Sequence, residues 1–322
     1  MSRTARALAH PNIALIKYWG KRHIPLNLPA VSSLSVTLDT FETDTTVTWD
    51  HGGSTDRIVV NHTPLTGKGA QRVSRFLDLV GGPDRPRCAV ESTNNFPTAA
   101  GLASSASAFA ALALATCAAA DQDLDRTRLS ILARQGSGSA SRSLWGGWVR
   151  WDKGERADGT DSHGILLAPR DHWDVSVVVA LVGSGPKPIG STAGMVRTQE
   201  TCALYPGWVD SAEADVREAE AALEARDLDR LGAAMERSTY KMHATMIATW
   251  PPIRYWRPQT VAVLEAIESL RQAGVSAWST MDAGPNVKVL CATEDVPRVV
   301  AAIESAGVAA RPLGVGGDAR LV

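Results

Sequence analysis

The sequence predicts a protein of mixed strands and helices arranged in two lobes. Three observations support this prediction. The chain has 322 residues, which is enough for a large core and for two lobes. Segments with the composition of strands are frequent in the first half, whereas long segments of helical periodicity begin near residue 208. The character changes over residues 172–190, so we place the boundary between lobes of residues 1–172 and 173–322.

Strands are expected at four places in the first half of the chain. Residues 5–17 are apolar with few breaks, and residues 34–49 are rich in Thr and Val that partly alternate. Residues 57–60 follow a Gly-Gly-Ser turn and have the composition of a strand, and residues 147–151 form an aromatic one. Extended segments therefore alternate with the helices predicted next.

Three helices are expected between these strands. Apolar residues recur at helical spacing over residues 68–80 and stop at Gly81-Gly82-Pro83. An alanine-rich helix follows over 104–120, and another over 125–135. The second half begins with a β-branched run at 174–182, which predicts a buried strand. Beyond it the pattern predicts helices at 208–225, 227–248, 259–273 and 297–305, and a strand at 287–292.

Composition excludes several classes of function. The net charge of -1 gives no global basic field to attract nucleic acid. No apolar run approaches the ~20 residues that cross a bilayer, and the first ten residues are not followed by the apolar region typical of a signal peptide. The four cysteines are far apart without a C-x-x-C pair, which argues against structural zinc and a disulfide framework. We therefore expect a cytoplasmic protein without nucleic-acid or membrane partners.

Residues 97–107 have the character of a phosphate-binding loop. Gly, Ala and Ser residues lead directly into a predicted helix, whose first N–H groups and positive dipole end suit an anion. A tightly packed, serine-capped helix start is the alternative, and spacing alone leaves both open. The loop is not a Walker A motif. A second pattern, Gly314-x-Gly316-x-x-Ala319, imitates a dinucleotide fingerprint but leaves no room for a following helix.

Two lysines and an arginine are candidates for binding anions. Lys17 ends an apolar run, where a desolvated ammonium is costly unless it meets an anion, and Lys21 lies four residues on. Arg142 follows the small-residue segment 136–141 and could hold a carboxylate through two parallel bonds. The alternatives are a lysine that extends to solvent at a strand end and an arginine in a surface salt bridge.

Asp282 is the candidate acid. It follows Ser279-Thr280-Met281 and precedes Ala-Gly-Pro-Asn, so a single carboxylate lies among small neutral residues that would admit a ligand. The alternative is an aspartate that caps a turn at Gly284-Pro285.

Together these segments resemble a known family. Pro97-x-x-x-Gly101-Leu102-x-Ser104-Ser105-Ala106 is similar to the phosphate loop of the GHMP kinases. The finer resemblance is to the diphosphomevalonate decarboxylases of that superfamily, and it is carried by four further segments at 10–21, 32–38, 136–144 and 281–286. All five occur in the family's order.

The resemblance implies a two-lobed α+β fold of the GHMP kinase type. The N-terminal, ATP-binding lobe would be similar to the ribosomal S5 domain 2-like fold, and the C-terminal lobe would be a helix-covered antiparallel sheet. The active site would lie in the cleft between the lobes, and the family suggests a homodimer.

The implied reaction is the ATP-dependent decarboxylation of (R)-5-diphosphomevalonate to isopentenyl diphosphate, with ATP as co-substrate and Mg²⁺ as cofactor. By resemblance, Asp282 is the base for the C3 hydroxyl, Lys17 stands near the reacting oxygen, and Arg142 holds the substrate carboxylate. Substrate binding is implied for Asn12, Tyr18, Lys21, Ser137, Gly138, Ser139 and Arg197. ATP binding is implied for Pro97, Ala100, Gly101, Leu102, Ser104, Ser105 and Ser107. The magnesium ligands stay open, with Ser105 as a candidate.

Other activities compete with this one. The nearest are a mevalonate 3-kinase and a phosphomevalonate decarboxylase; a GHMP kinase for a sugar or amino acid is more distant, and the segment Lys17-Tyr18-Trp19-Gly20-Lys21 argues against it. A ligand-binding protein without catalysis would be expected to have lost Asp282 or the phosphate loop. Val31 and Cys202 depart from residues common in the family and could alter substrate choice.

Overall fold

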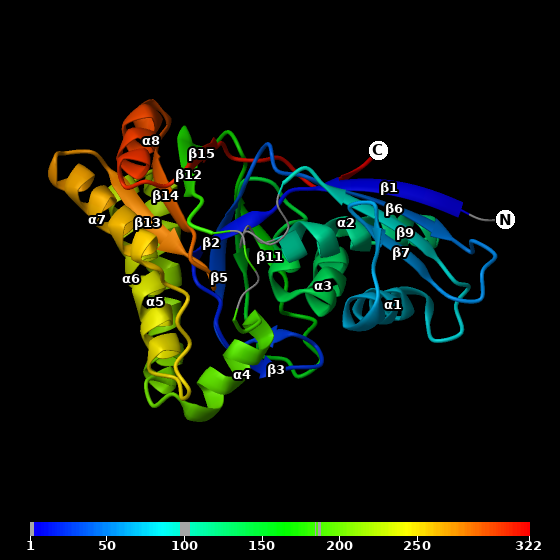
Figure 1. Ribbon diagram of the computed structural model, residues 1–322. Helices are drawn as coiled ribbons and strands as arrows, with labels where there is room; N and C mark the ends of the chain where they lie inside the picture. Colours follow the sequence, from blue (N-terminus) through cyan, green and yellow to red (C-terminus); the bar gives the residue numbers. More distant parts are fainter. Residues whose placement is uncertain (1–2, 97–103, 184, 186–187) are drawn as a thin grey trace.

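The computed structural model describes residues 3–96, 104–183, 185 and 188–322. Three larger sheets and a two-stranded pair are packed with helices into two sheet-containing lobes (Figure 1). This arrangement confirms the predicted two-lobed α+β class.

A six-stranded sheet forms the outer part of the first lobe. Its order is β16-β1-β6-β9-β7-β8. The strands are β1 (Arg3–Ala9), β6 (Thr43–Trp49), β7 (Arg57–Val60), β8 (Thr63–Pro64), β9 (Ala89–Asn94) and β16 (Arg320–Leu321). Side chains of β6 alternate between buried and half-buried, as expected where helices cover one face of a sheet.

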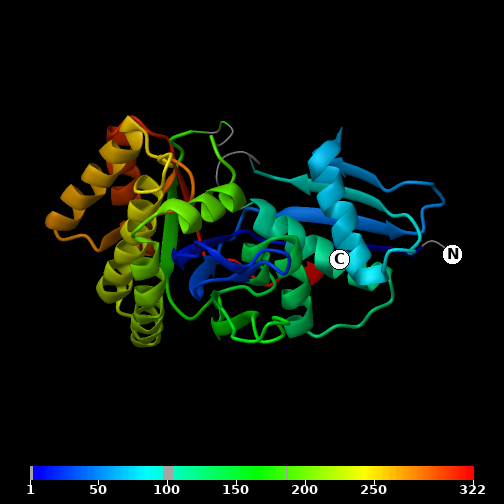
Figure 2. The ribbon, with the colours of Figure 1, turned by 90° about the horizontal axis from the view of Figure 1, so that it is seen from below.

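Helices α1 (Gly67–Gly81) and α2 (Ser104–Ala119) share a hydrophobic core with this sheet, and α3 (Arg126–Gly136) packs against both helices (Figure 2). The alanine-rich α2 is apolar on all sides because it is enclosed by β1, β6 and α3. Its small side chains allow these close contacts on every face. The short 3₁₀ helix η1 (Gly138–Ser141) follows α3 and turns the chain toward the centre of the molecule.

The central sheet has the order β11-β10-β5-β2 and lies between the outer sheet and the second lobe. Its strands are β2 (Asn12–Ile16), β5 (Ser33–Thr37), β10 (Trp148–Trp151) and β11 (Gly164–Ala168). Every residue of β2 and β5 is buried, because α5 (Tyr205–Ala225) and α6 (Leu228–Ile247) pack against them from the second lobe. The side chain of Lys17, which directly follows β2, is therefore held in the interior.

The sheet of the second lobe is antiparallel, with the order β13-β14-β12-β15. Its strands are β12 (Val175–Ala180), β13 (Ala277–Met281), β14 (Val287–Ala292) and β15 (Ala310–Leu313). Alternate residues of β12 face two cores: Val177 packs with the α6 side, and Val178 packs with α7 (Pro258–Gln272) and α8 (Val296–Ser305). Helices on both faces confirm the predicted helix-covered sheet.

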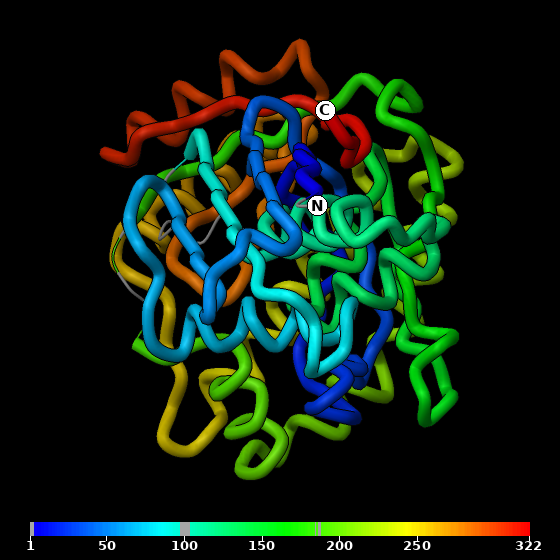
Figure 3. Tube along the Cα trace, turned by 90° about the vertical axis from the view of Figure 1, so that its right-hand side faces the viewer, coloured from blue at the N-terminus to red at the C-terminus, as the bar shows by residue number. Residues whose placement is uncertain are grey.

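The two ends of the chain meet in the outer sheet. β16 pairs antiparallel with β1, so the polypeptide beyond Leu313 leaves the second lobe and returns to the first (Figure 3). The glycines of the dinucleotide-like pattern serve this return. Gly316 donates its N–H to the carbonyl of Thr37, and a Cβ on Gly316 would lie 2.0 Å from the carbonyl oxygen of Leu38. Close backbone packing therefore accounts for this glycine.

The structure differs from the predicted elements in several places, mostly at strands. The expected strand at 5–17 is broken at His10-Pro11 into β1 and β2, which belong to different sheets. Helix α4 (Ser191–Thr201) was not anticipated, because only Gly194, Met195 and Thr198 are buried and the apolar periodicity is weak. The short pair β3 (Lys21–His23) and β4 (Leu28–Pro29) and the 3₁₀ turn η2 (Thr293–Asp295) are not among the predicted elements either. The prediction also omits six further strands, namely β8, β9, β11, β13, β15 and β16.

Candidate active site

A cavity of about 780 Å³ lies where the end of β2, the start of α4, the η1 region and the end of β13 approach one another. Its lining brings together most of the polar residues predicted from the sequence. Those residues are Asn12, Lys17, Tyr18, Lys21, Ser105, Ser137, Gly138, Ser139, Arg142 and Asp282.

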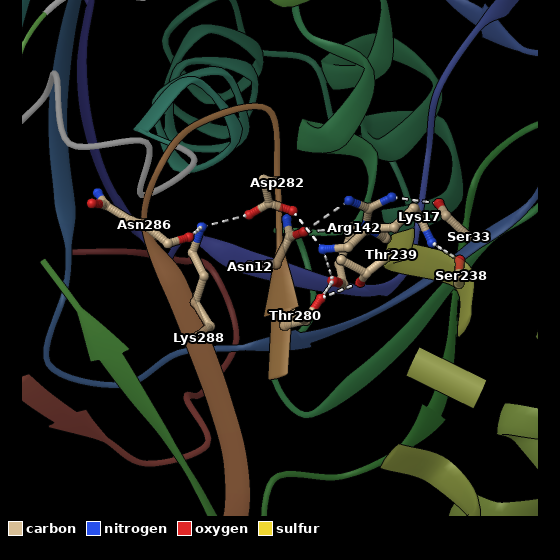
Figure 4. A network of polar contacts seen from close by, with 11 residues as sticks. Asn12, Lys17, Ser33, Arg142, Ser238, Thr239, Thr280, Asp282, Asn286 and Lys288 are labelled. Atoms are coloured by element: carbon tan, nitrogen blue, oxygen red, sulfur yellow. Dashed lines mark hydrogen bonds and ion pairs between the residues drawn. The ribbon is translucent and has the colours of Figure 1, made fainter. Parts of the chain in front are cut away.

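Asp282 lies between two lysines. The ammonium of Lys17 is 2.9 Å from its Oδ1, and the ammonium of Lys288 is 3.1 Å from its Oδ2 (Figure 4). Both lysine side chains are 1% exposed, whereas the side chain of Asp282 is 27% exposed because it faces the cavity. Of these three charged side chains, the carboxylate of Asp282 is therefore the one that is accessible from the cavity.

The pKa of Asp282 lies well below its ordinary value. Burial acts to raise the pKa, but the charges of Lys17 and Lys288 and their hydrogen bonds outweigh that effect. Asp282 is therefore a carboxylate at neutral pH and can accept a hydrogen bond from a hydroxyl in the cavity.

Lys17 is fixed at the point where β2 ends. Its backbone N–H donates to Ser238 Oγ on α6, and its ammonium donates to the carbonyl of Ala14 as well as to Asp282. Burial lowers the pKa of Lys17 to about 8, and the charge of Asp282 partly offsets this effect. The ammonium is still mostly protonated at neutral pH.

Arg142 carries a second buried cation. Its guanidinium donates to Oδ1 of Asn12 at 3.1 and 3.0 Å and to Ser33 Oγ at 2.5 Å. Among the residues described, no carboxylate lies within ion-pair distance of it, and burial lowers its pKa to about 10. Because an unpaired buried charge is costly, this arrangement favours an anionic ligand.

Asn12 orients this arginine. Its Nδ2 donates to the carbonyl of Ser139 at 3.0 Å and to Ser143 Oγ at 2.8 Å, while its Oδ1 accepts from Arg142. Both the oxygen and the nitrogen of the side-chain amide therefore already have hydrogen-bond partners within the protein. Asn12 lines the cavity, but its hydrogen bonds support Arg142 rather than leaving a group for a ligand.

Lys21 and Tyr18 provide donors in another part of the cavity. Lys21 Nζ donates to Asn27 Oδ1 at 2.6 Å and to Thr192 Oγ1 at 3.3 Å, and burial lowers its pKa to about 8. The hydroxyl of Tyr18 is buried without a hydrogen-bond partner among the described residues. Gly20, with φ of 108°, turns the chain between these two side chains.

Some predicted residues do not reach the cavity. Ser107 is fully buried, and its hydroxyl contacts Thr43 Oγ1 at 2.7 Å on β6. Ser104 and Arg197 are outside the lining, and Arg197 lies half-buried on α4. Four ATP-binding predictions, Pro97, Ala100, Gly101 and Leu102, lie outside the described residues.

Sequence reasoning also missed residues that the fold brings in. The predicted site does not include Lys288, although a lysine inside the apolar run 287–292 indicates a buried charge. Arg72 and Arg75 on α1 line the cavity beside Lys21. No pattern in α1 distinguishes these two from ordinary exposed arginines, so the sequence carried no signal for them.

Comparisons with known proteins give a consistent result. Residues 9–164 match a family model described as the diphosphomevalonate decarboxylase-like N-terminal domain, and residues 177–311 match the mevalonate 5-diphosphate decarboxylase C-terminal domain. A diphosphomevalonate decarboxylase of Ganoderma lucidum is 38% identical over 92% of this chain and 80% of its own length.

Solved structures agree. The mevalonate diphosphate decarboxylase of Staphylococcus aureus is 36% identical, with a TM-score of 0.94 over 100% of this chain and 98% of that one. A structure of MDDEF in complex with MVAPP, AMPPCP and magnesium is 38% identical, with a TM-score of 0.93 over 100% of this chain and 99% of that one.

Proposed function

The chain belongs to the diphosphomevalonate decarboxylase family, and from that premise we propose how its residues divide the reaction between them. The activity is the ATP-dependent decarboxylation of (R)-5-diphosphomevalonate to isopentenyl diphosphate, with release of CO2, ADP and phosphate. Asp282 accepts the proton of the C3 hydroxyl as that oxygen attacks the γ-phosphate of ATP. The observation that carries this assignment is the position of Asp282, which is open to the cavity and held between two buried lysines.

The low pKa of Asp282 shapes this step. A carboxylate so stabilised by Lys17 and Lys288 is a weak base, and it would not remove the proton of a tertiary alcohol in advance. Phosphoryl transfer commonly proceeds through a loose transition state in which the acceptor oxygen gains little bonding early. Asp282 therefore orients the hydroxyl first and accepts its proton late, as P–O bond formation acidifies it.

Lys17 and Arg142 act on the charges that follow. Lys17 stabilises the C3 oxygen and the transferred phosphoryl group, because its ammonium lies beside Asp282 in the cavity. When phosphate leaves C3, the C1–C2 electron pair forms the C2=C3 bond and CO2 departs. Arg142 fixes the substrate carboxylate before that step, which agrees with its lack of a carboxylate partner among the described residues.

Tyr18, Lys21 and the Ser137-Gly138-Ser139 segment bind the substrate diphosphate. They line the same cavity, and Lys21 meets only neutral oxygens of Asn27 and Thr192 in the contacts described. Arg197 lies outside this lining, so we propose it only as a contributor when ligand is bound.

Selectivity for the diphosphate is the first test. We expect CO2 release from diphosphomevalonate with a kcat/KM at least about tenfold above that for the monophosphate or mevalonate, since each charge-assisted bond contributes about 1.5–3 kcal/mol. Lys21→Met should raise the KM for diphosphomevalonate about 10- to 100-fold with little change in kcat. Arg22→Met, at the exposed neighbouring residue, is the matched control.

The three substrates separate the competing activities. Equal kcat/KM for all of them would contradict the diphosphate assignment. ADP formation from mevalonate without CO2 would indicate a 3-kinase instead.

ATP and Mg²⁺ fit the donors on this side of the cavity. The hydroxyl of Ser105 lies at the start of α2, 3.3 Å from Ser137 Oγ, and both residues line the cavity. The described residues contain no group of three or more His, Cys, Asp or Glu side chains placed to hold a metal. Such a site suits Mg²⁺ held mainly by ATP phosphates, with Ser105 as its candidate protein ligand. When bound, the ion neutralises phosphate charge.

The pH dependence of the reaction follows from the two lysines. Burial lowers the pKa of Lys17 and of Lys21 to about 8, so both are charged below that pH and neutral above it. We expect kcat/KM to fall above pH ~8, and the fall in kcat to occur at higher pH because bound anions raise both pKa values. A kcat/KM that stays level between about pH 7 and about pH 10 would contradict these roles.

Three further predictions remain proposals. The division of the chain at residues 172 and 173 and the cytoplasmic location come from the composition of the sequence, and the homodimer comes from the resemblance to the family. In the part of the chain that the structure describes, no helix combines the length and the apolar character needed to span a bilayer.

A further inference from the structure

Lys288 is a charged residue in the core of the second lobe. It is the second residue of β14, lies opposite Thr280 of β13, and is 1% exposed, while its chain neighbours Val287 and Val289 face the core on the other side of the sheet. Burial of an ammonium in such surroundings is costly unless it is paired. Its side chain reaches the edge of the active site, where it lies 3.1 Å from Oδ2 of Asp282.

Lys288 approaches Asp282 from behind the cavity. Figure 4 shows Lys17 and Lys288 on opposite sides of the carboxylate, with one lysine on each oxygen. Lys17 and Asp282 line the cavity, whereas Lys288 is not among the lining residues. A ligand in the cavity would therefore meet Asp282 and Lys17, and Lys288 could influence it only through them.

Charges around Asp282 come from several elements. Lys17 at the end of β2, Lys288 on β14 and Arg142 after η1 are cations, and His243 on α6 also faces the group. Burial lowers the pKa of His243 to about 3, so this histidine is neutral at working pH. Among the residues that the structure describes, three cations thus surround the carboxylate, and Lys17 and Lys288 touch it.

From this arrangement we infer that Lys288 is a positioning residue for the reaction: it holds Oδ2 of Asp282 from behind, so that Oδ1 faces Lys17 and the substrate hydroxyl. The inference rests on the proposed role of Asp282 as the base. A carboxylate with one oxygen anchored cannot rotate away from the C3 hydroxyl, which preserves the geometry that proton transfer requires.

Lys288 also sets the charge state of both partners. Its charge lowers the pKa of Asp282, and it lowers the pKa of Lys17 as well. Removal of this charge should raise both pKa values. The pH–rate profile falls at low pH when Asp282 becomes protonated (its acidic limb) and at high pH when Lys17 loses its proton (its alkaline limb). Both limbs should then move to higher pH, whereas a purely structural role of Lys288 would move neither.

The test compares Lys288→Met, Lys288→Gln and Lys288→Arg in the full chain. Met fills similar space without charge, Gln keeps a hydrogen-bond donor, and Arg keeps the charge. We expect kcat to fall about 10- to 100-fold in Lys288→Met, with the KM values for both substrates within about twofold and both limbs moved to higher pH. Lys288→Arg should restore much of kcat and return both limbs toward their wild-type positions.

Val287→Ala is the matched control in the same strand. It removes buried apolar contacts on the opposite face of β14 without altering any charge, so it should lower thermal stability and leave both limbs in place. If Lys288→Met does not fold, the pH–rate profile of Lys288→Gln, which also lacks the charge, is compared with that of the wild type instead. Wild-type kcat and limbs in a folded neutral variant would overturn the inference, and so would a loss that only mirrors that of Val287→Ala.

A double-mutant cycle separates this inference from the proposed function. If Lys288 acts through Asp282, Lys288→Met should cause no further loss of kcat in an Asp282→Asn background. Additive losses would overturn the role of Lys288 while leaving Asp282 as the base. Normal turnover in Asp282→Asn alone would instead overturn the proposed base itself.

Discussion

Asp282→Asn is expected to lower kcat about a thousandfold while ATP binding persists, since general-base catalysis contributes about 10²–10⁴. Asn has nearly the same shape as Asp, but it cannot accept the proton of the C3 hydroxyl. It also removes the negative charge that raises the pKa of Lys17, so part of the Lys17 population would lose its proton near neutral pH.

Steady-state assays of ADP and CO2, fluorescent-nucleotide binding and thermal unfolding measure the three parts of this prediction. Asp295→Asn, at an aspartate that pairs with Arg298 on the surface of the second lobe, is the control. Near-normal turnover in Asp282→Asn with intact ATP binding would show that another group accepts the proton.

Lys17→Met is expected to lower kcat about 100- to 1,000-fold, the range seen when one donor to a developing negative charge is removed. The fold should survive, because Asp282 keeps Lys288 as its partner and the methionine occupies an otherwise apolar strand end. KM for ATP should change little, since the ammonium acts chiefly on charge that develops in the transition state.

Lys241→Met provides a matched control for this variant. Lys241 pairs with the buried Asp215, which also keeps Arg237, so the substitution breaks a comparable ion pair outside the cavity. It should reduce stability and leave kcat unchanged. If Lys17→Met unfolds while Lys241→Met folds, or if both retain wild-type kcat, Lys17 is a structural residue and the proposed role is wrong.

Sequence reasoning succeeded where one residue conflicted with its own surroundings. A charge at the end of an apolar strand predicts a buried partner for Lys17, and Lys17 is indeed buried against Asp282. The same reasoning applied to residues 287–292 would have selected Lys288. It failed for Ser107, because a hydroxyl on a small-residue helix can turn either to a ligand or to a neighbouring strand, and here it turns to Thr43.

The helices are largely predictable from the sequence, since apolar periodicity shows which side of a helix is buried, whereas strands such as β9, β11, β13 and β15 are not predicted. Errors arise where the apolar periodicity is weak or the segment is short. Helix α4 buries only Gly194, Met195 and Thr198, so its apolar periodicity is weak, and the break between β1 and β2 depends on which sheet each half joins. The sheet that each half joins depends on the distant strands with which it pairs, and not on residues 5–17 alone.

The sequence by itself determined the chemical groups of this protein: an acid among small residues, two lysines near an apolar strand end, an arginine after a small-residue turn, and the family order that links them. Only the tertiary structure decided how those groups pair. Lys17 and Asp282 are 265 residues apart, and they meet because α6 joins the end of β2 to the sheet that carries β13. Ion pairing depends on separations of a few ångströms, and those distances exist only after the two lobes have packed.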